Sequence, residues 1–412
     1  RIMFFSRSRD IIWTRITCAI NFVGRKMMHS ESATLEPTLV PANTSDPKPV
    51  KKADRQFDFK LYTQRHIALK VAYLGWDYHG LAIQETADDT IESKLFEALK
   101  RAKLIESHLE CKFARCGRTD KGVSALSQVV SLYVRSNLLE GVGVVSNADC
   151  RASERKGDKT TEIPYMHILN KLLPEDIRVL AWAPVSADFS ARFSCLQRTY
   201  KYIFPRGNLD ISRMQCAAQK FVGEHDFRNF CKMDVAGGTT NFRRRILSFD
   251  INPLDNSPSS PYQMHEVTIT GLAFLWHQLV DQMLDIEKCP RKPQYGMASE
   301  IPLMLFDCVF EDVNWQRDEQ AHEYLVSHFQ ALWTAQMVRA TMLRRMLDSL
   351  EYSFLTGMGT PTLPSSQLAP LVTDQKSKSK SYKPMMSRQT SASLDELIDY
   401  HQSKRRRLEE ED

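Results

Sequence analysis

The sequence has no uninterrupted apolar run of the roughly 20 residues that a membrane-spanning helix needs. It also lacks short-period repeats, and its nine cysteines include no Cys-x-x-Cys pair. Cys111 and Cys116 have no matching pair of ligands nearby in the sequence, so their spacing argues against a zinc site. The cysteine usage instead indicates a reducing compartment. A membrane protein, a repeat protein and a zinc-stabilised module are therefore all disfavoured.

A large excess of one charge is missing as well. The chain of 412 residues carries 55 lysines and arginines against 50 acidic residues, a formal net charge of +5. That balance permits nucleic-acid binding without requiring it. With 42% hydrophobic and 25% charged residues, the composition is typical of a globular chain, and its length suffices for one large core or two domains.

What the chain does have is an unusual loop, residues 115–125, which reads RCGRTDKGVSA. Asp120 stands between Arg118 and Lys121, and cations this close favour its ionised form while offering contacts to an anionic polymer. A glycine on each side permits backbone angles and close approaches that a side chain would block. The stretch therefore has the residue types of a functional loop.

Rigid elements are expected on both sides of this loop. Apolar residues at helical spacing predict a helix over residues 91–104, with Asp89 and Glu92 as its capping arrangement. Alternating apolar residues predict a half-buried strand over residues 130–134. A loop held by two such elements is a common setting for a site. From spacing alone, a surface ion-pair loop is equally compatible with the sequence.

The RCGRTDKGVSA stretch closely resembles the catalytic loop of the TruA family of tRNA pseudouridine synthases. Further stretches that match this family occur at residues 73–84 (YLGWDYHGLAIQ), 189–204 (FSARFSCLQRTYKYIF), 226–234 (DFRNFCKMD) and 271–278 (GLAFLWHQ). The KMD ending resembles the eukaryotic branch that modifies positions 38 and 39 of the tRNA anticodon arm. The resemblance covers about residues 64–315. Taken alone, residues 73–84 fit a packed turn or a binding loop, and the resemblance implies that they face RNA.

The resemblance implies an α/β (α+β) fold in which two similar halves, each with a mostly antiparallel sheet flanked by helices, surround a basic RNA-binding cleft. It also implies tRNA as the partner, a homodimer, and a reaction that needs no metal and no organic cofactor. The expected divisions are a disordered leader at 1–63, an N-terminal half with the Asp loop at 64–186, a C-terminal half at 187–315, and a helical extension with a basic tail at 316–412.

The same resemblance implies roles for individual residues. Asp120 attacks the substrate covalently or abstracts a ribose proton, and the sequence leaves both open. Arg118 takes the place of a flipped nucleotide and binds phosphate. Tyr200 packs on the target uracil, although aromatic residues at its spacing are otherwise typical of a core. Candidate RNA contacts are Arg115, Lys121, Arg192, Arg243, Arg244 and Arg245. The run of three arginines is equally compatible with a solvated face.

One stretch departs from the family pattern. After Gln278, relatives continue with Val-Arg and a long apolar helix, whereas this chain runs into polar residues from Asp281 to Lys288. The helix is therefore expected to be shortened, and the arginine that neighbours the catalytic aspartate in relatives has no counterpart. Without this ion-pair partner, the alternative is a catalytically impaired relative that still binds tRNA.

The two ends of the chain carry other signals. Residues 1–26 are basic with apolar positions, which fits a mitochondrial presequence or translated upstream sequence with the start at Met27 or Met28. Residues 27–60 read as a disordered leader. Near the other end, Ser393 and Glu396 predict a capping box for a last helix. The run at 404–407 fits nuclear import, a phosphate patch or a plain solvated tail, and the expected location is the nucleus and cytoplasm.

Overall fold

The computed structural model describes residues 57–85, 88–146, 148–231, 241–255, 262–272, 287, 289–294, 298–358 and 387–411. Every described residue belongs to one compact unit, residues 57–412. The predicted leader and presequence therefore lie almost entirely outside the described residues. The predicted shortening of the helix after Gln278 lies outside them too.

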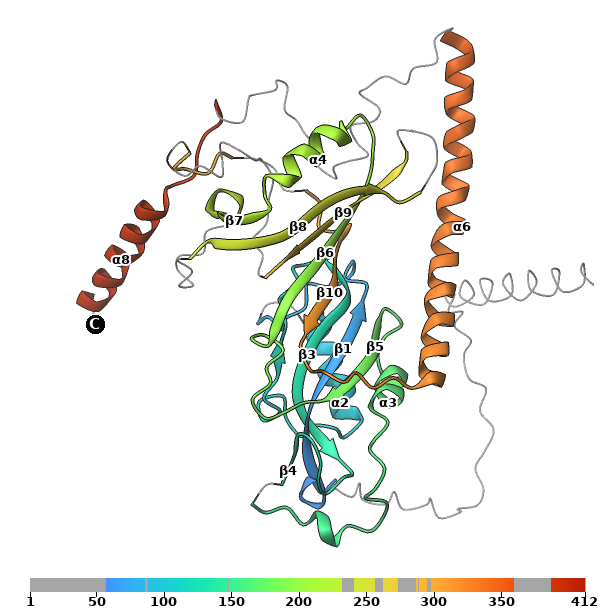
Figure 1. Cartoon of the computed structure of the whole chain (residues 1–412), viewed down its shortest axis with the longest axis vertical. Helices are drawn as coiled ribbons and strands as arrows, with labels where there is room; N and C mark the ends of the chain where they lie inside the picture. Colours follow the sequence, from blue (N-terminus) through green and yellow to red (C-terminus); the bar gives the residue numbers. More distant parts are fainter. Residues whose placement is uncertain are drawn as a thin grey trace, which may run out of the picture. The chain divides into compact units, whose positions relative to one another are not determined.

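A ten-stranded sheet forms the centre of the described unit (Figure 1). Its strands are β1 (Thr63–Tyr73), β2 (Ala114–Arg115), β3 (Ser124–Ser136), β4 (Val144–Val145), β5 (Ile177–Pro184), β6 (Cys195–Pro205), β7 (Gly223–Asp226), β8 (Arg243–Pro253), β9 (Met264–Gly271) and β10 (Leu303–Phe310). They follow the order β4-β1-β3-β10-β6-β9-β8-β7, with β5 also paired to β1 and β2 to β3. Only the β3–β10 pair among them is parallel. The predicted α/β fold with mostly antiparallel sheet is confirmed.

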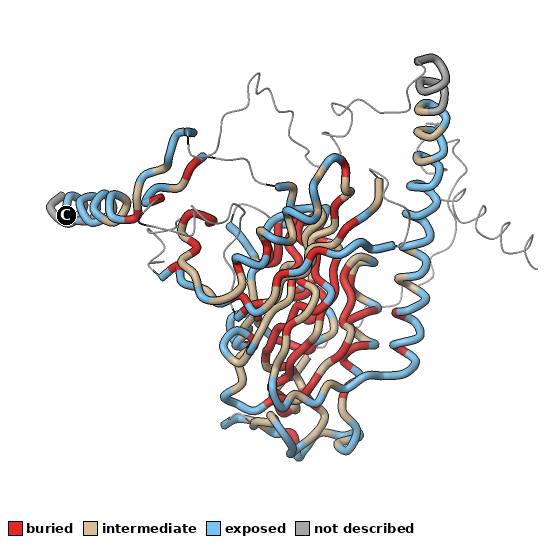
Figure 2. The backbone as a smooth tube through the Cα atoms, turned by 45° about the horizontal axis from the view of Figure 1, so that its top comes forward, coloured by how far each residue is buried: buried red, intermediate tan, exposed pale blue. Residues whose placement is uncertain are grey.

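The helices of the described unit are α2 (Ile91–Arg101), α3 (Tyr165–Leu172), α4 (Ile211–Gln219), α6 (Glu319–Met358) and α8 (Leu394–Glu411), with short 3-10 helices η1 (Phe59–Leu61), η2 (Ala152–Glu154) and η3 (Arg228–Phe230). Side chains of α2 and α3 share one hydrophobic core with β1, β3 and β5. Most of α6 is exposed, whereas buried residues concentrate in the sheet (Figure 2). Among the described residues, none of these helices combines the length and the apolarity that crossing a membrane requires.

The strand expected over residues 130–134 is present, but it is longer and more deeply buried than the alternation predicts. It belongs to β3, whose residues are almost all buried on both faces. The reason is its environment, since β3 lies inside the sheet between β1 and β10 and its side chains share one hydrophobic core with residues of α2 and α3. A strand that is covered on both faces loses the polar face that a strand with one solvated face keeps.

Helix α2 forms where its apolar spacing predicts, with Leu95 and Leu99 buried. Its cap differs from the prediction, because Thr90 and Ser93 form the reciprocal capping box. The assignment of Asp89 and Glu92 as the cap is therefore wrong, and Glu92 is instead a buried residue, 1% exposed. The other predicted capping box is confirmed: Ser393 N donates to Glu396 Oε2 at 2.9 Å, and Glu396 N donates to Ser393 Oγ at 3.2 Å.

The two expected halves meet at the parallel β3–β10 pair. A core cluster built mainly from the first half extends through this pair to Tyr200 of β6. A second cluster, which includes Phe204, Phe221 and Phe249, lies among β6, α4 and β8. The halves are thus parts of one continuous sheet, and their exact boundaries stay a prediction.

Candidate active site around the Asp120 loop

The Asp120 loop connects β2 to β3, and backbone contacts fix both of its ends. Cys116 N donates to Val129 O at 2.8 Å, and the Gln128 side-chain amide donates to Gly117 O at 2.9 Å. At the tip, Val123 N donates to Asp120 O at 3.2 Å. The turn leaves the Asp120 side chain exposed to solvent. The loop therefore presents its carboxylate outward from a rigid base.

The segment 73–84 packs directly against this loop. Leu81 N donates to Thr119 O at 3.1 Å, and Gly122 N donates to Tyr78 O at 3.2 Å. Gly80 has a φ of +100°, and a Cβ there would lie 2.9 Å from Thr119 O, so only glycine fits. Of the two readings of this segment, the structure favours the packed turn, since its backbone supports the Asp120 loop.

Strand register brings Tyr200 to the same place. Tyr73 is opposite Ala125, Leu305 is paired with both Ala125 and Tyr200, and these strands are neighbours in the sheet. A Cβ built on Gly117 would lie 3.9 Å from the Tyr200 hydroxyl. Tyr200 is only 8% exposed, and this burial raises its pKa well above the ordinary tyrosine value. The phenol next to the loop is therefore protonated at neutral pH.

Arg198 is the residue that sequence reasoning missed. Its guanidinium donates to Cys116 O at 2.9 Å, to Arg192 O at 3.2 Å and to Leu272 O at 2.8 Å. It thereby joins the Asp120 loop to the segment before β6 and to the end of β9. The signal was present, because Arg198 is two residues from Tyr200 and therefore on the same strand face as Tyr200.

Comparison with known proteins agrees with this geometry. Residues 217–279 match the family model described as tRNA pseudouridine synthase. The tRNA pseudouridine(38/39) synthase of Bos taurus is 45% identical over 392 residues, covering 87% of this chain and 81% of that protein. The synthase of the same name from Homo sapiens is 44% identical over 400 residues, covering 87% of this chain and 81% of that protein. The one from Saccharomyces cerevisiae is 46% identical over 293 residues, covering 65% of this chain and 62% of that protein.

This chain belongs to the tRNA pseudouridine synthase family. The predicted family membership and enzyme class are thus confirmed. The family match ends at residue 279, beside the predicted departure after Gln278, and His277 and the residues up to 286 lie outside the described ones. Roles of single residues in this synthase remain predictions.

Several predicted RNA contacts lie around the Asp120 loop of the synthase. Arg118 and Lys121 are exposed on the loop itself. Arg192 is exposed too, and its guanidinium carbon lies 5.3 Å from the ring centroid of Phe193, which is 81% exposed. A cation beside an exposed aromatic ring suits an unpaired nucleotide, which needs a phosphate contact and a stacking surface. Sequence reasoning assigned no role to Phe193.

The run Arg243, Arg244 and Arg245 begins β8 at the same end of the sheet. Leu272 N donates to Arg245 O at 3.2 Å, while Leu272 O accepts from Arg198. Arg243 and Arg245 are exposed, and Arg243 forms a solvent-exposed ion pair with Glu224 at 3.6 Å. Hydrogen bonds of Leu272 and of the Arg198 guanidinium thus connect this run to the Asp120 loop. The run adds positive charge at the loop's end of the sheet.

Arg115 differs from the other predicted RNA contacts. Its Nε lies 2.9 Å from Glu92 Oε1, and the Glu92 side chain is 2% exposed. Burial raises the pKa of Glu92, while the Ile83 N–H, Arg115 and Arg118 act against this rise. The Arg115 charge is therefore directed at a buried carboxylate, and its first effect is on stability.

Arg115→Met is expected to lower the free energy of unfolding by about 2–3 kcal/mol. This is less than the roughly 3–5 kcal/mol of a fully buried pair, because 27% of the Arg115 side chain is exposed. The substitution raises the pKa of Glu92 further. The loss should therefore be greatest at neutral pH and shrink as the pH falls through the raised pKa of Glu92, above the ordinary glutamate value of 4.5, because Glu92 then takes up a proton in the folded protein. Urea unfolding at several pH values measures it.

Arg101→Met is the matched control, since Arg101 pairs with Glu97 while both side chains are more than half exposed. We expect a change below about 0.5 kcal/mol there. Equal losses in the two variants, or a loss at Arg115 that grows toward acid pH, would contradict the buried pair.

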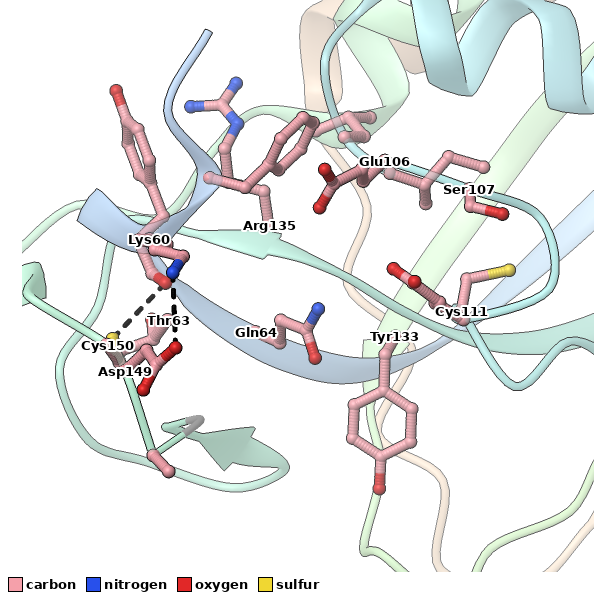
Figure 3. Close-up of a pocket in the computed structure, with 16 residues that line it drawn as sticks. Lys60, Thr63, Gln64, Glu106, Ser107, Cys111, Tyr133, Arg135, Asp149 and Cys150 are labelled. Carbon is pink, nitrogen blue, oxygen red and sulfur yellow. Dashed lines mark hydrogen bonds and ion pairs between the residues drawn. The ribbon is translucent and has the colours of Figure 1, made fainter.

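Figure 3 shows a cavity of about 390 Å³, whose lining includes no residue of the Asp120 loop. Its lining includes Gln64 of β1 and Tyr133 and Arg135 of β3. These residues lie at one end of the β1–β3 pair, whereas Tyr73 and Ala125 lie at the other end. The labelled polar groups include Lys60, which forms an ion pair with Asp149 at 3.2 Å. None of the predicted site residues lines this cavity. The candidate active site is therefore the open surface around Asp120.

Proposed function

We propose that this protein converts uridine to pseudouridine at position 38 or 39 of the tRNA anticodon stem-loop. The observation that carries the proposal is an exposed Asp120, held in a rigid loop beside Tyr200, in a chain 44–45% identical to synthases named for these positions. The surrounding cations Arg118, Lys121 and Arg192 suit a substrate of high negative charge.

The reaction is an isomerisation with balanced atoms. The bond from ribose C1′ to uracil N1 breaks, the base turns, and C1′ bonds to uracil C5; C5 loses its proton and N1 gains one. Asp120 serves as the nucleophile that holds the ribose or as the base that takes a ribose proton. Its exposure allows either role, since a carboxylate at the tip of a loop reaches a nucleotide turned out of its stack.

Tyr200 and Arg118 have distinct tasks in this proposal. The Tyr200 ring offers a surface on which the detached uracil stays while it turns. Because its phenol is held protonated by burial, it is suited to donate a hydrogen bond and unsuited to act as the base in the free protein. Arg118, exposed two residues before Asp120, binds phosphate and fills the space left by the flipped nucleotide.

The proposal extends to the assembly and location of the protein. We propose a homodimer, as the family resemblance implies, which light scattering on the purified chain tests. We also propose nuclear and cytoplasmic location. The run at 404–407 lies in α8, where Lys404, Arg406 and Arg407 are exposed, as an import signal requires. Fusing α8 to a fluorescent reporter tests the import step.

The test of the function uses tRNA from cells that lack pseudouridine in the anticodon arm. After incubation with the chain, pseudouridine is mapped by chemical adduct and reverse-transcription stops. A stop one nucleotide from position 38 or 39 supports the proposal. Bound but unmodified tRNA would instead support the impaired relative, and restoring the missing helix after Gln278 should then restore modification. Modification at other uridines alone would refute the choice of position.

A further inference from the structure

Three cysteines from distant parts of the sequence meet directly behind the Asp120 loop. Cys116 lies in the loop, Cys195 begins β6, and Cys308 lies on β10. Their sulfur atoms all lie within 4.8 Å of one another, and Cys116 Sγ is 3.3 Å from Cys308 Sγ. No local spacing in the sequence predicts this group, since 192 positions separate Cys116 from Cys308.

The sheet explains the convergence. Cys116 is bonded to Val129 of β3 through its N–H, and β10 runs beside β3. Cys308 is paired with Arg198 of β6, near the Cys195 end of that strand. Each cysteine thus belongs to a different segment, and each segment is part of the sheet or hydrogen-bonded to it.

The donor set favours a particular kind of ion. Three sulfurs form the group, and no fourth histidine, cysteine, aspartate or glutamate joins it among the residues that the structure describes. Zinc sites built from cysteine normally have four ligands, and sites with three protein ligands keep an open position for water. Soft thiolates prefer ions such as monovalent copper, for which three sulfurs suffice.

Burial and charge suit such an ion as well. Cys116 and Cys308 are 3% exposed, so water is excluded, while half-buried Cys195 leaves a route of entry. The Arg198 guanidinium interacts electrostatically with all three cysteines. Its positive charge offsets one of the two excess negative charges that three thiolates around a monovalent ion would carry.

We propose that Cys116, Cys195 and Cys308 form a binding site for a soft, thiophilic metal ion of the monovalent copper type. Bound there, the ion ties the base of the Asp120 loop to β6 and β10. The site adds to the proposed function and does not depend on it, because the chemistry of uridine isomerisation uses none of the three thiols.

The first test titrates the reduced, full-length chain with Cu(I) under nitrogen, in competition with a chromogenic Cu(I) chelator. We expect one tight site. Cys116→Ser, Cys195→Ser and Cys308→Ser should each weaken it by at least about 100-fold, since even second-shell changes cost 10- to 100-fold. Cys111→Ser is the matched control for a buried thiol outside the group, and Cys216→Ser the control for an exposed one.

A second test needs no variant, so it holds even if a serine variant fails to fold. Cu(I) should slow the alkylation of half-buried Cys195, read by mass spectrometry, and leave exposed Cys216 reactive. X-ray absorption should show three sulfur neighbours around the ion. Equal protection of both cysteines, two sulfur neighbours, or a tight site that survives all three serine variants would overturn the proposal.

Discussion

Asp120→Asn should reduce the rate of pseudouridine formation by at least about 10⁴-fold, the scale seen when a reacting side chain is removed from other enzymes. The amide has the shape of the carboxylate, yet it neither attacks carbon nor accepts a proton at neutral pH. Asp120 is exposed, and it is the backbone carbonyl of Asp120 that accepts the hydrogen bond from Val123 N. Changing the side chain should therefore leave folding unchanged. The measurement is proton release from uracil C5 in tRNA under single-turnover conditions.

Binding should separate from chemistry in this variant. Because one negative charge is lost between Arg118 and Lys121, tRNA affinity should be equal to that of the unaltered protein or slightly higher. Asp77→Asn is the control, since Asp77 is an exposed aspartate of the neighbouring segment. If Asp120→Asn kept more than about a tenth of the rate, another group would have to be the reacting one.

The sequence predicts correctly those elements that depend on interactions between residues close together in the chain. The apolar spacing of α2 and the capping box at Ser393 both depend on residues within a few positions of each other, and both are confirmed. The predicted cap of α2 is wrong because neighbouring residues are equally suitable by type. Asp89, Thr90 and Glu92 are all acceptable by type, and only tertiary structure reveals that Glu92 is needed for a buried ion pair.

Long-range pairing accounts for what the sequence could not reveal. Parallel β3–β10 pairing places residues 304–305 beside residues 124–125, and no periodicity encodes which distant strand inserts there. The cysteine group behind the Asp120 loop follows from that insertion. The resemblance names Asp120 and Tyr200 from separate stretches, and the structure brings the Asp120 loop next to Tyr200, although their roles stay predictions. Arg115, predicted as an RNA contact, is directed at Glu92.

Arg198→Met should lower kcat by about 100-fold while the dissociation constant for tRNA changes little. The guanidinium bonds three backbone carbonyls from three segments, those of Cys116, Arg192 and Leu272. Methionine keeps much of the apolar stem but none of these bonds, so the Asp120 loop loses a brace at its base. A displacement of about 1 Å at a reacting group is enough for a loss of this size. Single-turnover rates and filter binding separate the two effects.

A positioning role, distinct from a structural one, can be recognised by partial rescue. Arg198→Lys keeps the charge but not the planar fork that reaches three acceptors, so its rate should fall between those of the arginine and methionine proteins. Arg213→Met is the control, because the Arg213 side chain is 90% exposed and its ion pair, within the described part of the chain, is with Asp210 of its own helix turn. A rate loss that merely followed the unfolded fraction of Arg198→Met would count against positioning. A loss in fully folded protein, with lysine intermediate, places Arg198 as the residue that holds the Asp120 loop in its reactive position.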